Sequence, residues 1–580
     1  TVLQEMGAVL MLDRTRINAL GAALLAGLSA CTQAGDAPRD GEAGPAPQVA
    51  SSVDGVVVAA QPLAAEAGAM VLRAGGNAAD AAVAAAFAVS VVEPSMNSIG
   101  GRTQVLVRLP DGTFAGIDAT TQAPATYDPA TAPQASYGYP TVGVPGAVAG
   151  LTRLLDEYGT MDLDQVMAPA IALAEDGFEL LPGEAARHRA GSGQLAEFDG
   201  SRAHYLNPTG EPRAAGESFV QPDLAATLRT IAEGGADAFY RGPIAELITA
   251  DMETHGGAVT LQSLADYQAL DAAIVRGSYR GYDLVGTDIP ASGAVTIGIL
   301  HILEHFDMAS LDQDSWAGLV GTAIARAFEE RAAIRESGSG NLEPMTDKAW
   351  AAGVAAGIEV PGAMLRAAGA ARTDTHAMVA AANWEDSAWG PADSHTTHLS
   401  AADAGGMYVS LTQTIGPNLG SKVATPGLGF LYAATLGGYL GYMEPGERAR
   451  SSISPLMVVQ DGEPVLVLGA AGGARIISAV VQAVLRVVDQ GMTLPDALAA
   501  ARVHPIDDGI AMETSPVIGW TPEVVAEVES WGMEVQAVER EGAFGRIHGI
   551  WVDPRTGEKV GVADPDWEGA AVVPDAKERK

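Results

Sequence analysis

Strand-like segments lie near both ends of this 580-residue chain, and a long helical stretch lies between them. Residues 49–61 read as strand, and residues 103–118 read as two strands around an Asp-Gly turn, a typical hairpin signal. Residues 146–375 are mainly helical in pattern, and strand-like sequence returns from residue 396 to a last hairpin at 549–564. Strands that pair into sheets with helices on the outside form layers, so we predict a layered α+β fold.

Glycine pairs and Asp-Gly turns divide these regions further. Residues 62–94 read as two alanine-rich helices separated at Gly75-Gly76, because glycine commonly ends a helix. Asp461-Gly462 is predicted to join two strands, and a helix is predicted over residues 474–491. No internal repeat of fixed period is present in the sequence.

The charge and the cysteine content exclude several classes of function. A formal net charge of -37 argues against a nucleic-acid partner, because phosphate binding needs clustered Lys and Arg. The single cysteine permits neither an intramolecular disulfide nor a cysteine-based zinc site. The segment HILEH at 301–305 matches a zinc-protease pattern, but that pattern is short and needs a third ligand. We therefore expect no metal and no cofactor.

The N-terminus has the features of an export signal. Arg14 and Arg16 precede an apolar run that is too short to span a bilayer comfortably and ends at Cys31. The sequence Leu-Ser-Ala-Cys at the end of this run resembles a bacterial lipobox, in which the cysteine is lipidated. We predict a lipoprotein signal peptide at 1–30, a Pro/Gly-rich flexible tether at 31–48, and a protein exported to the periplasm or cell envelope, with only the lipid touching the membrane. The alternative is a plain signal peptide with an incidental cysteine.

A pair of threonines stands at the start of the second strand-rich region, in the sequence DSHTTHLSAAD. A hydroxyl needs activation before it can attack, and no acid or base lies beside Thr396 at motif spacing. A free α-amine titrates near pH ~8 and can serve as the base of its own residue. Cleavage between His395 and Thr396 would free that amine. The stretch therefore indicates either a self-processed N-terminal nucleophile or an ordinary strand edge.

Two further segments have a possible catalytic use and a plain structural alternative. GAAGGAR at 469–475 places glycines between a strand and a helix, where backbone N–H groups can form an oxyanion hole or simply a tight turn. Ser451 and Ser452 precede a strand, where their hydroxyls can bind a ligand carboxylate or make local turn bonds.

Several long blocks together resemble the γ-glutamyltransferase (γ-glutamyltranspeptidase) family of N-terminal-nucleophile hydrolases. They include GGNAADAAVAAAFAVSVVEP, VGVPGAVAGL, APAIALAEDGF, QPDLAATLRTIAEGGADAFYRGPIAE, TTHLSAAD, SSISP and GAAGGARII, and the resemblance covers about residues 50–575. It implies a precursor that cuts itself before Thr396. The products would be a large subunit (49–395) and a small catalytic subunit (396–580), held together as a heterodimer in one four-layer αββα sandwich.

The resemblance also implies a role for individual residues. Acyl transfer would use Thr396 as the nucleophile, attacking the amide of a small molecule such as glutathione or another γ-glutamyl compound. The implied supporting residues are Thr414 beside the nucleophile, Gly472 and Gly473 in the oxyanion hole, Ser451 and Ser452 at the substrate carboxylate, and His395, Thr396 and Thr397 at the processing site.

The sequence departs from the family pattern where the substrate is held. Thr120 stands at the position of an arginine that pairs with the α-carboxylate of the γ-glutamyl group. Gly416 and Gly438 stand where the family has a substrate-binding asparagine and aspartate, and Arg102 interrupts a run of glycines. The resemblance thus implies intact acylation machinery, with Thr120 and Arg102 left as candidate substrate contacts.

These observations lead to one expected function and two alternatives. We expect an exported, self-processing γ-glutamyltransferase or glutathione hydrolase that passes an acyl group to water or an amine. The first alternative is an amidase of the same superfamily, similar to a cephalosporin acylase, with non-γ-glutamyl specificity. The second is an inactive lipoprotein that serves as a binding module.

Overall fold

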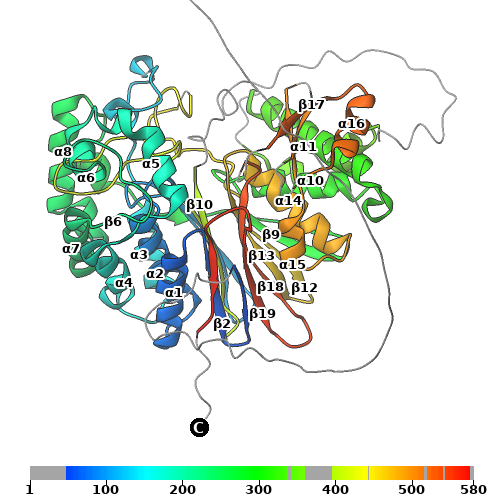
Figure 1. Ribbon diagram of the computed structural model, residues 1–580, viewed down its shortest axis with the longest axis horizontal. Helices are drawn as coiled ribbons and strands as arrows, with labels where there is room; N and C mark the ends of the chain where they lie inside the picture. Colours follow the sequence, from blue (N-terminus) through cyan, green and yellow to red (C-terminus); the bar gives the residue numbers. More distant parts are fainter. Residues whose placement is uncertain are drawn as a thin grey trace, which may run out of the picture. The chain divides into compact units, whose positions relative to one another are not determined.

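The computed structural model describes residues 48–132, 134–336, 341–359, 395–441, 443–507, 509–514, 519–539 and 543–574 (Figure 1). The predicted signal peptide, Cys31 and all of the tether except Gln48 lie outside these residues, as do residues 360–394 before His395. None of the described helices combines the length and the apolar character needed to cross a bilayer.

Two antiparallel sheets form the centre of the fold. The first sheet runs, in order of pairing, β20 (Ala570–Val572), β2 (Gly55–Ala59), β10 (Thr397–Asp403), β11 (Tyr408–Thr414), β3 (Arg102–Arg108), β4 (Phe114–Ala119) and β7 (Leu270–Asp271). The second sheet runs β1 (Val49–Ser52), β19 (Lys559–Ala563), β18 (Arg546–Val552), β13 (Glu463–Leu468), β12 (Leu456–Gln460), β9 (Tyr282–Thr287) and β8 (Ile274–Tyr279), and β14 (Ala470–Ala471) also pairs with β18. Each sheet combines strands from before and after the His395–Thr396 junction.

The two sheets pack face to face. Val56 and Val58 of β2 and Ala402 of β10 share one buried apolar cluster with Met457 of β12 and Ile550 of β18. Alternate residues of β2 face the other way, because successive side chains of a strand point to opposite faces. The inner faces therefore form a core between the sheets, and the outer faces need a cover.

Helices provide that cover on both sides (Figure 1). The first sheet shares a core with α1 (Pro62–Arg73), α2 (Ala78–Val92), α3 (Ala147–Tyr158), α4 (Leu163–Asp176), α5 (Pro182–Leu195), α6 (Asp199–Tyr205), α7 (Pro222–Tyr240), α8 (Pro243–His255) and α9 (Leu261–Ala265). The second sheet shares a core with α10 (Gly293–Leu303), α11 (Gln313–Glu336), α12 (Lys348–Ala355), α14 (Arg475–Val488), α15 (Leu494–Ala499) and α16 (Pro522–Ser530). The predicted four-layer αββα sandwich is confirmed.

Helix α2 lies directly against β10 and β11, and its sequence explains why it can be buried completely. Asn77 caps its first turn, and the Asp80 carboxylate accepts a hydrogen bond from the Asn77 N–H at 2.8 Å, which forms a capping box. Every residue of the helix is buried, and most are alanine. Small side chains let the helix approach the sheet closely, so α2 gives a rigid support to the strand that follows Thr396.

The structure differs from the expected helical middle region chiefly in one stretch. Residues 274–287 form the β8–β9 hairpin, which closes one edge of the second sheet. Its turn is Arg280-Gly281, and both residues have positive φ angles. The alternation in β8 and β9 is short and flanked by helices, so the surrounding pattern obscured it. Two smaller sheets were also not predicted: β15 (Val503–Ile506), β16 (Gly509–Glu513) and β17 (Glu534–Val538), and the pair β5 (Phe178–Glu179) and β6 (Ser218–Phe219).

Candidate active site

Thr396 lies immediately before β10, and its buried hydroxyl donates a hydrogen bond to Thr414 Oγ1 at 3.0 Å. The pairing of β10 with β11 produces this contact, because Thr397 is opposite Gln413 and the next residue of β11 is Thr414. Thr396 has a φ of +86°, which a β-branched residue rarely adopts. Such a conformation costs about 1–3 kcal/mol and is often found at functional sites. The backbone is therefore strained at the bond where cleavage is predicted.

The carbonyl of His395 accepts a hydrogen bond from the N–H of Gly472 at 3.2 Å. Gly472 has a φ of +131°, and a Cβ added there would lie 2.9 Å from the Gly545 Cα, so only glycine fits without a shift. Gly473 follows with a φ of +60°, and its carbonyl accepts from the N–H of Ile476 at the start of α14. The glycine turn thus points a donor at the carbonyl oxygen of the peptide bond before Thr396. An oxyanion hole requires this arrangement.

His395 lies among positively charged side chains. Its burial, together with the charges of Arg102, Arg546, Lys422 and Arg475, lowers its pKa to about 3, so the imidazole is neutral at physiological pH. Strand pairing brings two of these cations to the site. Arg102 of β3 is opposite Thr414, and Arg546 of β18 is opposite Ala471, the residue before Gly472.

Sequence reasoning named only Arg102 of these four cations. Arg475 directly follows the glycine segment, so its position in GAAGGAR was a usable signal. Arg546 and Lys422 had no motif that could have identified them, because the pairing of β18 and the loop after β11 bring them near His395. A chain with a net charge of -37 therefore places a cluster of buried cations around the residue before its candidate nucleophile.

Thr120, a candidate substrate contact, lies just after β4 and is fully buried. Its hydroxyl donates to Asp118 Oδ1 at 2.8 Å. The same carboxylate accepts from Gln104 Nε2 at 3.0 Å and pairs with Arg448 at 3.3 Å. Because its one proton is used by Asp118, Thr120 can offer a substrate only the lone pairs of its oxygen.

Ser451 and Ser452 are buried just before β12. The Oγ of Ser451 accepts from the N–H of Ile453 at 3.2 Å, and its carbonyl accepts from the Ser292 hydroxyl at 2.7 Å. The local turn bond considered as the structural alternative is therefore present. It does not use the proton of the Ser451 hydroxyl, which can still donate to a ligand.

Gly416 and Gly438 stand where the resemblance implies polar side chains, and neither position has room for one. Gly416 has a φ of +86°, and an added Cβ would lie 2.9 Å from the ring of Tyr439, which also packs edge-on against His395. At Gly438 an added Cβ would lie 2.5 Å from the backbone oxygen of Gln134. An aromatic ring and a loop backbone thus fill the space that substrate-binding side chains would use.

A metal centre is not supported by the described part of the chain. No group of three or more His, Cys, Asp or Glu side chains there is arranged to hold an ion. His301, from the HILEH segment, is buried in α10, and its Nε2 lies 3.2 Å from the N–H of Ser278.

Comparisons with known proteins agree with this geometry. Residues 64–573 match the family model of gamma-glutamyltranspeptidase. The glutathione hydrolase proenzyme of Escherichia coli (strain K12) is 32% identical, with 94% of this chain and 96% of that protein aligned. The acylase ACY 1 proenzyme of Pseudomonas sp. (strain SE83) is 35% identical, with 82% and 86% aligned. Among solved structures, cephalosporin acylase from Bacillus halodurans superposes with a TM-score of 0.81 at 26% identity, covering 93% of this chain and 100% of that one.

Proposed function

We propose, since this chain belongs to the gamma-glutamyltranspeptidase family, that it is a self-processing acyl-transfer enzyme whose nucleophile is Thr396. Family membership makes it a γ-glutamyltranspeptidase-like or acylase-like hydrolase. The observation that carries the finer proposal is the pair of contacts at the junction: Thr396 to Thr414, and Gly472 to the carbonyl of His395.

Self-cleavage follows from this arrangement. The Oγ of Thr396 attacks the carbonyl carbon of His395, and the N–H of Gly472 stabilises the negative charge that develops on its oxygen. The C–N bond breaks, the Thr396 nitrogen takes up the hydroxyl proton, and an ester joins the two residues. Water hydrolyses this ester, giving a carboxylate at His395 and a free α-amine at Thr396. Relatives described as proenzymes support such a step.

Turnover uses the same groups on a substrate amide. The free α-amine, with a pKa near ~8, accepts the proton of the Thr396 hydroxyl as its oxygen attacks. The amide nitrogen leaves with a proton, and the acyl group stays on Thr396 as an ester. Water or an amine then takes the acyl group. The Gly472 turn again holds the oxyanion in both halves of the reaction.

We propose that the preferred acyl group lacks the α-ammonium of a γ-glutamyl group. An ammonium in this site would be repelled by the four cations near His395, since like charges in a poorly solvated site interact strongly. These cations are Arg102, Arg475, Arg546 and Lys422. The aspartate position that would hold the ammonium is Gly438, where the backbone of Gln134 fills the space. A neutral or anionic acyl group avoids both penalties.

A matched series of anilides tests this specificity. The γ-glutamyl, glutaryl and butanoyl 4-nitroanilides differ by the successive loss of the ammonium and the carboxylate. We expect glutaryl or butanoyl anilide to have the higher kcat/KM, by about tenfold or more, as expected when a buried charge loses its partner. A higher kcat/KM for the γ-glutamyl anilide would instead support the second candidate, glutathione hydrolysis, which the glutathione hydrolase relatives favour. No turnover of any amide by the processed protein would support the inactive binding module.

We also propose that the enzyme is exported and anchored through a lipid on Cys31. The support is the sequence alone, namely the basic residues, the apolar run and the lipobox-like segment. The test is the membrane-partition experiment described in the Discussion.

A further inference from the structure

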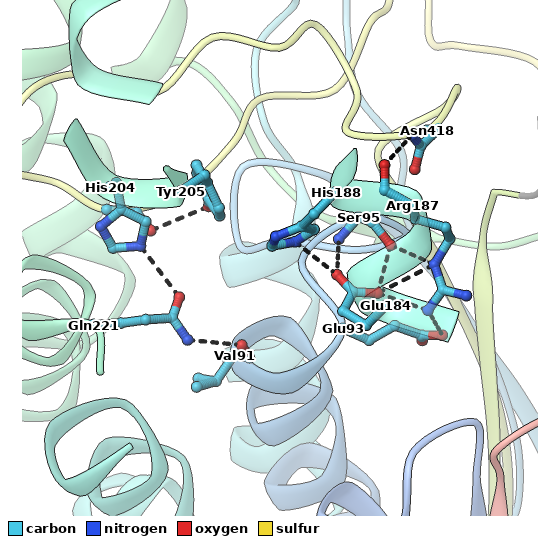
Figure 2. A network of polar contacts seen from close by, with 11 residues as sticks. Val91, Glu93, Ser95, Glu184, Arg187, His188, His204, Tyr205, Gln221 and Asn418 are labelled. Atoms are coloured by element: carbon cyan, nitrogen blue, oxygen red, sulfur yellow. Dashed lines mark hydrogen bonds and ion pairs between the residues drawn. The ribbon is translucent and has the colours of Figure 1, made fainter. Parts of the chain in front are cut away.

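A buried ion-pair network contacts the loop that follows Thr414, at Asn418 (Figure 2). At its centre is Glu184, in the first turn of α5, which is 2% exposed. Its carboxylate accepts hydrogen bonds from the N–H of Ser95 at 2.9 Å, from the Ser95 hydroxyl at 2.6 Å and from Arg187 Nη2 at 2.6 Å. Burial alone would raise the pKa of Glu184, but Arg187, His188 and Ser95 lower it to about 2. The carboxylate is therefore ionised and fully engaged.

Two members of this network hold the loop at 415–420 through their backbone carbonyls. The carbonyl of Ser95 accepts from the N–H of Leu419 at 2.7 Å. The carbonyl of Arg187 accepts from Asn418 Nδ2 at 3.1 Å (Figure 2). Leu419 has a φ of +60°, which leucine rarely adopts, so the loop needs bonds from outside to keep this shape.

The loop in turn fixes the hydroxyl that contacts the nucleophile. The N–H of Gly416 donates to Thr414 Oγ1 at 3.0 Å, and this oxygen also accepts from the Thr396 hydroxyl at 3.0 Å. A shift of the loop would move the Gly416 donor and release the Thr414 side chain. The geometry at Thr396 thus depends on hydrogen bonds to residues that lie more than 200 positions before it in the sequence.

The same network reaches the oxyanion side of the site. The guanidinium of Arg187 lies 4.4 Å from the centre of the Trp567 ring, and that of Arg546 lies 3.7 Å from it. Arg546 is opposite Ala471, which precedes Gly472. Trp567 Nε1 donates to Glu93 at 3.4 Å, and Glu93 lies 3.6 Å from Arg187. One connected set of residues therefore extends from the loop that holds Thr414 to the strand that pairs with the residue before Gly472.

We propose that Glu184 is a positioning residue for the acyl-transfer reaction, acting through Ser95 and Arg187 to fix the loop that orients Thr414 against Thr396. This inference rests on the proposed function, in which Thr396 is the nucleophile. Glu184 does not contact the substrate, so its loss should slow the chemical step and leave substrate affinity nearly unchanged. A displacement of about 1 Å at reacting groups can reduce a rate on the order of 100-fold.

The test compares Glu184→Gln and Ser95→Ala with a matched control in a neighbouring network. Gln221 is also fully buried and connects His204, at 3.2 Å, to the carbonyl of Val91, at 2.8 Å (Figure 2). Gln221→Leu removes a buried hydrogen-bonded side chain of the same layer without touching the loop bonds of Ser95 and Arg187. Self-cleavage rate, kcat, KM for the best anilide, and Tm are measured for all three variants and for the wild type.

We expect Glu184→Gln and Ser95→Ala to lower kcat and the self-cleavage rate by about 10- to 100-fold with KM changed by less than about threefold. Gln221→Leu should lower Tm by a similar amount and keep kcat near the wild-type value. If Glu184→Gln does not fold, Ser95→Ala, which keeps the ion pair, decides the question.

The two proposals fail in different ways. The positioning role alone would be overturned if all three variants had equal kcat values at an equal loss of Tm. These variants are Ser95→Ala, Glu184→Gln and Gln221→Leu. Activity that survives in Thr396→Ala would overturn the proposed function and this inference with it.

Discussion

Replacing Gly472 with alanine tests whether its N–H drives both cleavage and turnover. The φ of +131° at this position is unfavourable for any L-residue with a side chain, and the new Cβ would lie 2.9 Å from Gly545 Cα. Adopting the native conformation would cost about 1–3 kcal/mol. If the backbone shifts instead, the N–H that points at the His395 carbonyl is lost, and loss of one oxyanion donor costs about 2.7–4 kcal/mol, or 10²–10³ in rate. We therefore expect self-cleavage of Gly472→Ala to be slower by about 10²–10³.

A time course of the purified precursor on a denaturing gel measures this rate as the appearance of two fragments. The control is Gly491→Ala, because Gly491 has a φ of +64° and open space around it, beyond the other end of α14. It should carry a similar backbone penalty and cleave as the wild type does. If Gly472→Ala cleaves at the wild-type rate with an unchanged Tm, the oxyanion assignment is wrong.

Three other predictions concern the nucleophile, the anchor and pH. Thr396→Ala should remain a single chain without amidase activity, whereas two fragments on a gel would contradict Thr396-dependent cleavage. Cys31→Ser should leave the detergent phase or stay unprocessed, and a wild-type protein found wholly in the aqueous phase would favour a plain signal peptide. Burial lowers the pKa of His398 to about 3 from its ordinary 6.5. The unfolded chain therefore binds this proton at a higher pH than the folded chain does. Because of this difference, the free energy of unfolding should fall as the pH drops from about 6.5 towards 3. His398→Gln should flatten the dependence of Tm on pH in that window, and an unchanged slope would show that other groups cause it.

Local pattern was enough to predict several elements of the sandwich. The hairpin around Asp461-Gly462 is β12–β13, the hairpin around Asp111-Gly112 is β3–β4, and the helix expected at 474–491 is α14. These elements are specified by short-range signals such as turn residues and hydrophobic periodicity. The β8–β9 hairpin was missed because a short alternation inside a helical region gives a weak signal.

The candidate site was predictable only in part, because most of its neighbours come from distant segments. The resemblance suggested that Thr414 lies beside Thr396, and the pairing of β10 with β11 is consistent with this placement. Other contacts near the site join residues that share no sequence motif. Examples are the hydrogen bond between Leu419 and Ser95 and the strand pairing of Arg546 with Ala471. The sequence showed a glycine at 438 but not the Gln134 backbone oxygen that takes the place of a side chain there.

The mixed origin of both sheets has a consequence for what the proposed cut would produce. Strand β2 is hydrogen-bonded on one side to β10 and on the other to β20, and β3 pairs with β11, so strands of the two fragments are interleaved in this sheet. In the second sheet β12 pairs with β9, and β19 pairs with β1. Separating the fragments would require breaking these ladders and opening the core between the sheets. The two pieces would therefore behave as one folding unit, with a single melting transition and no dissociation on dilution, although no covalent bond would join them.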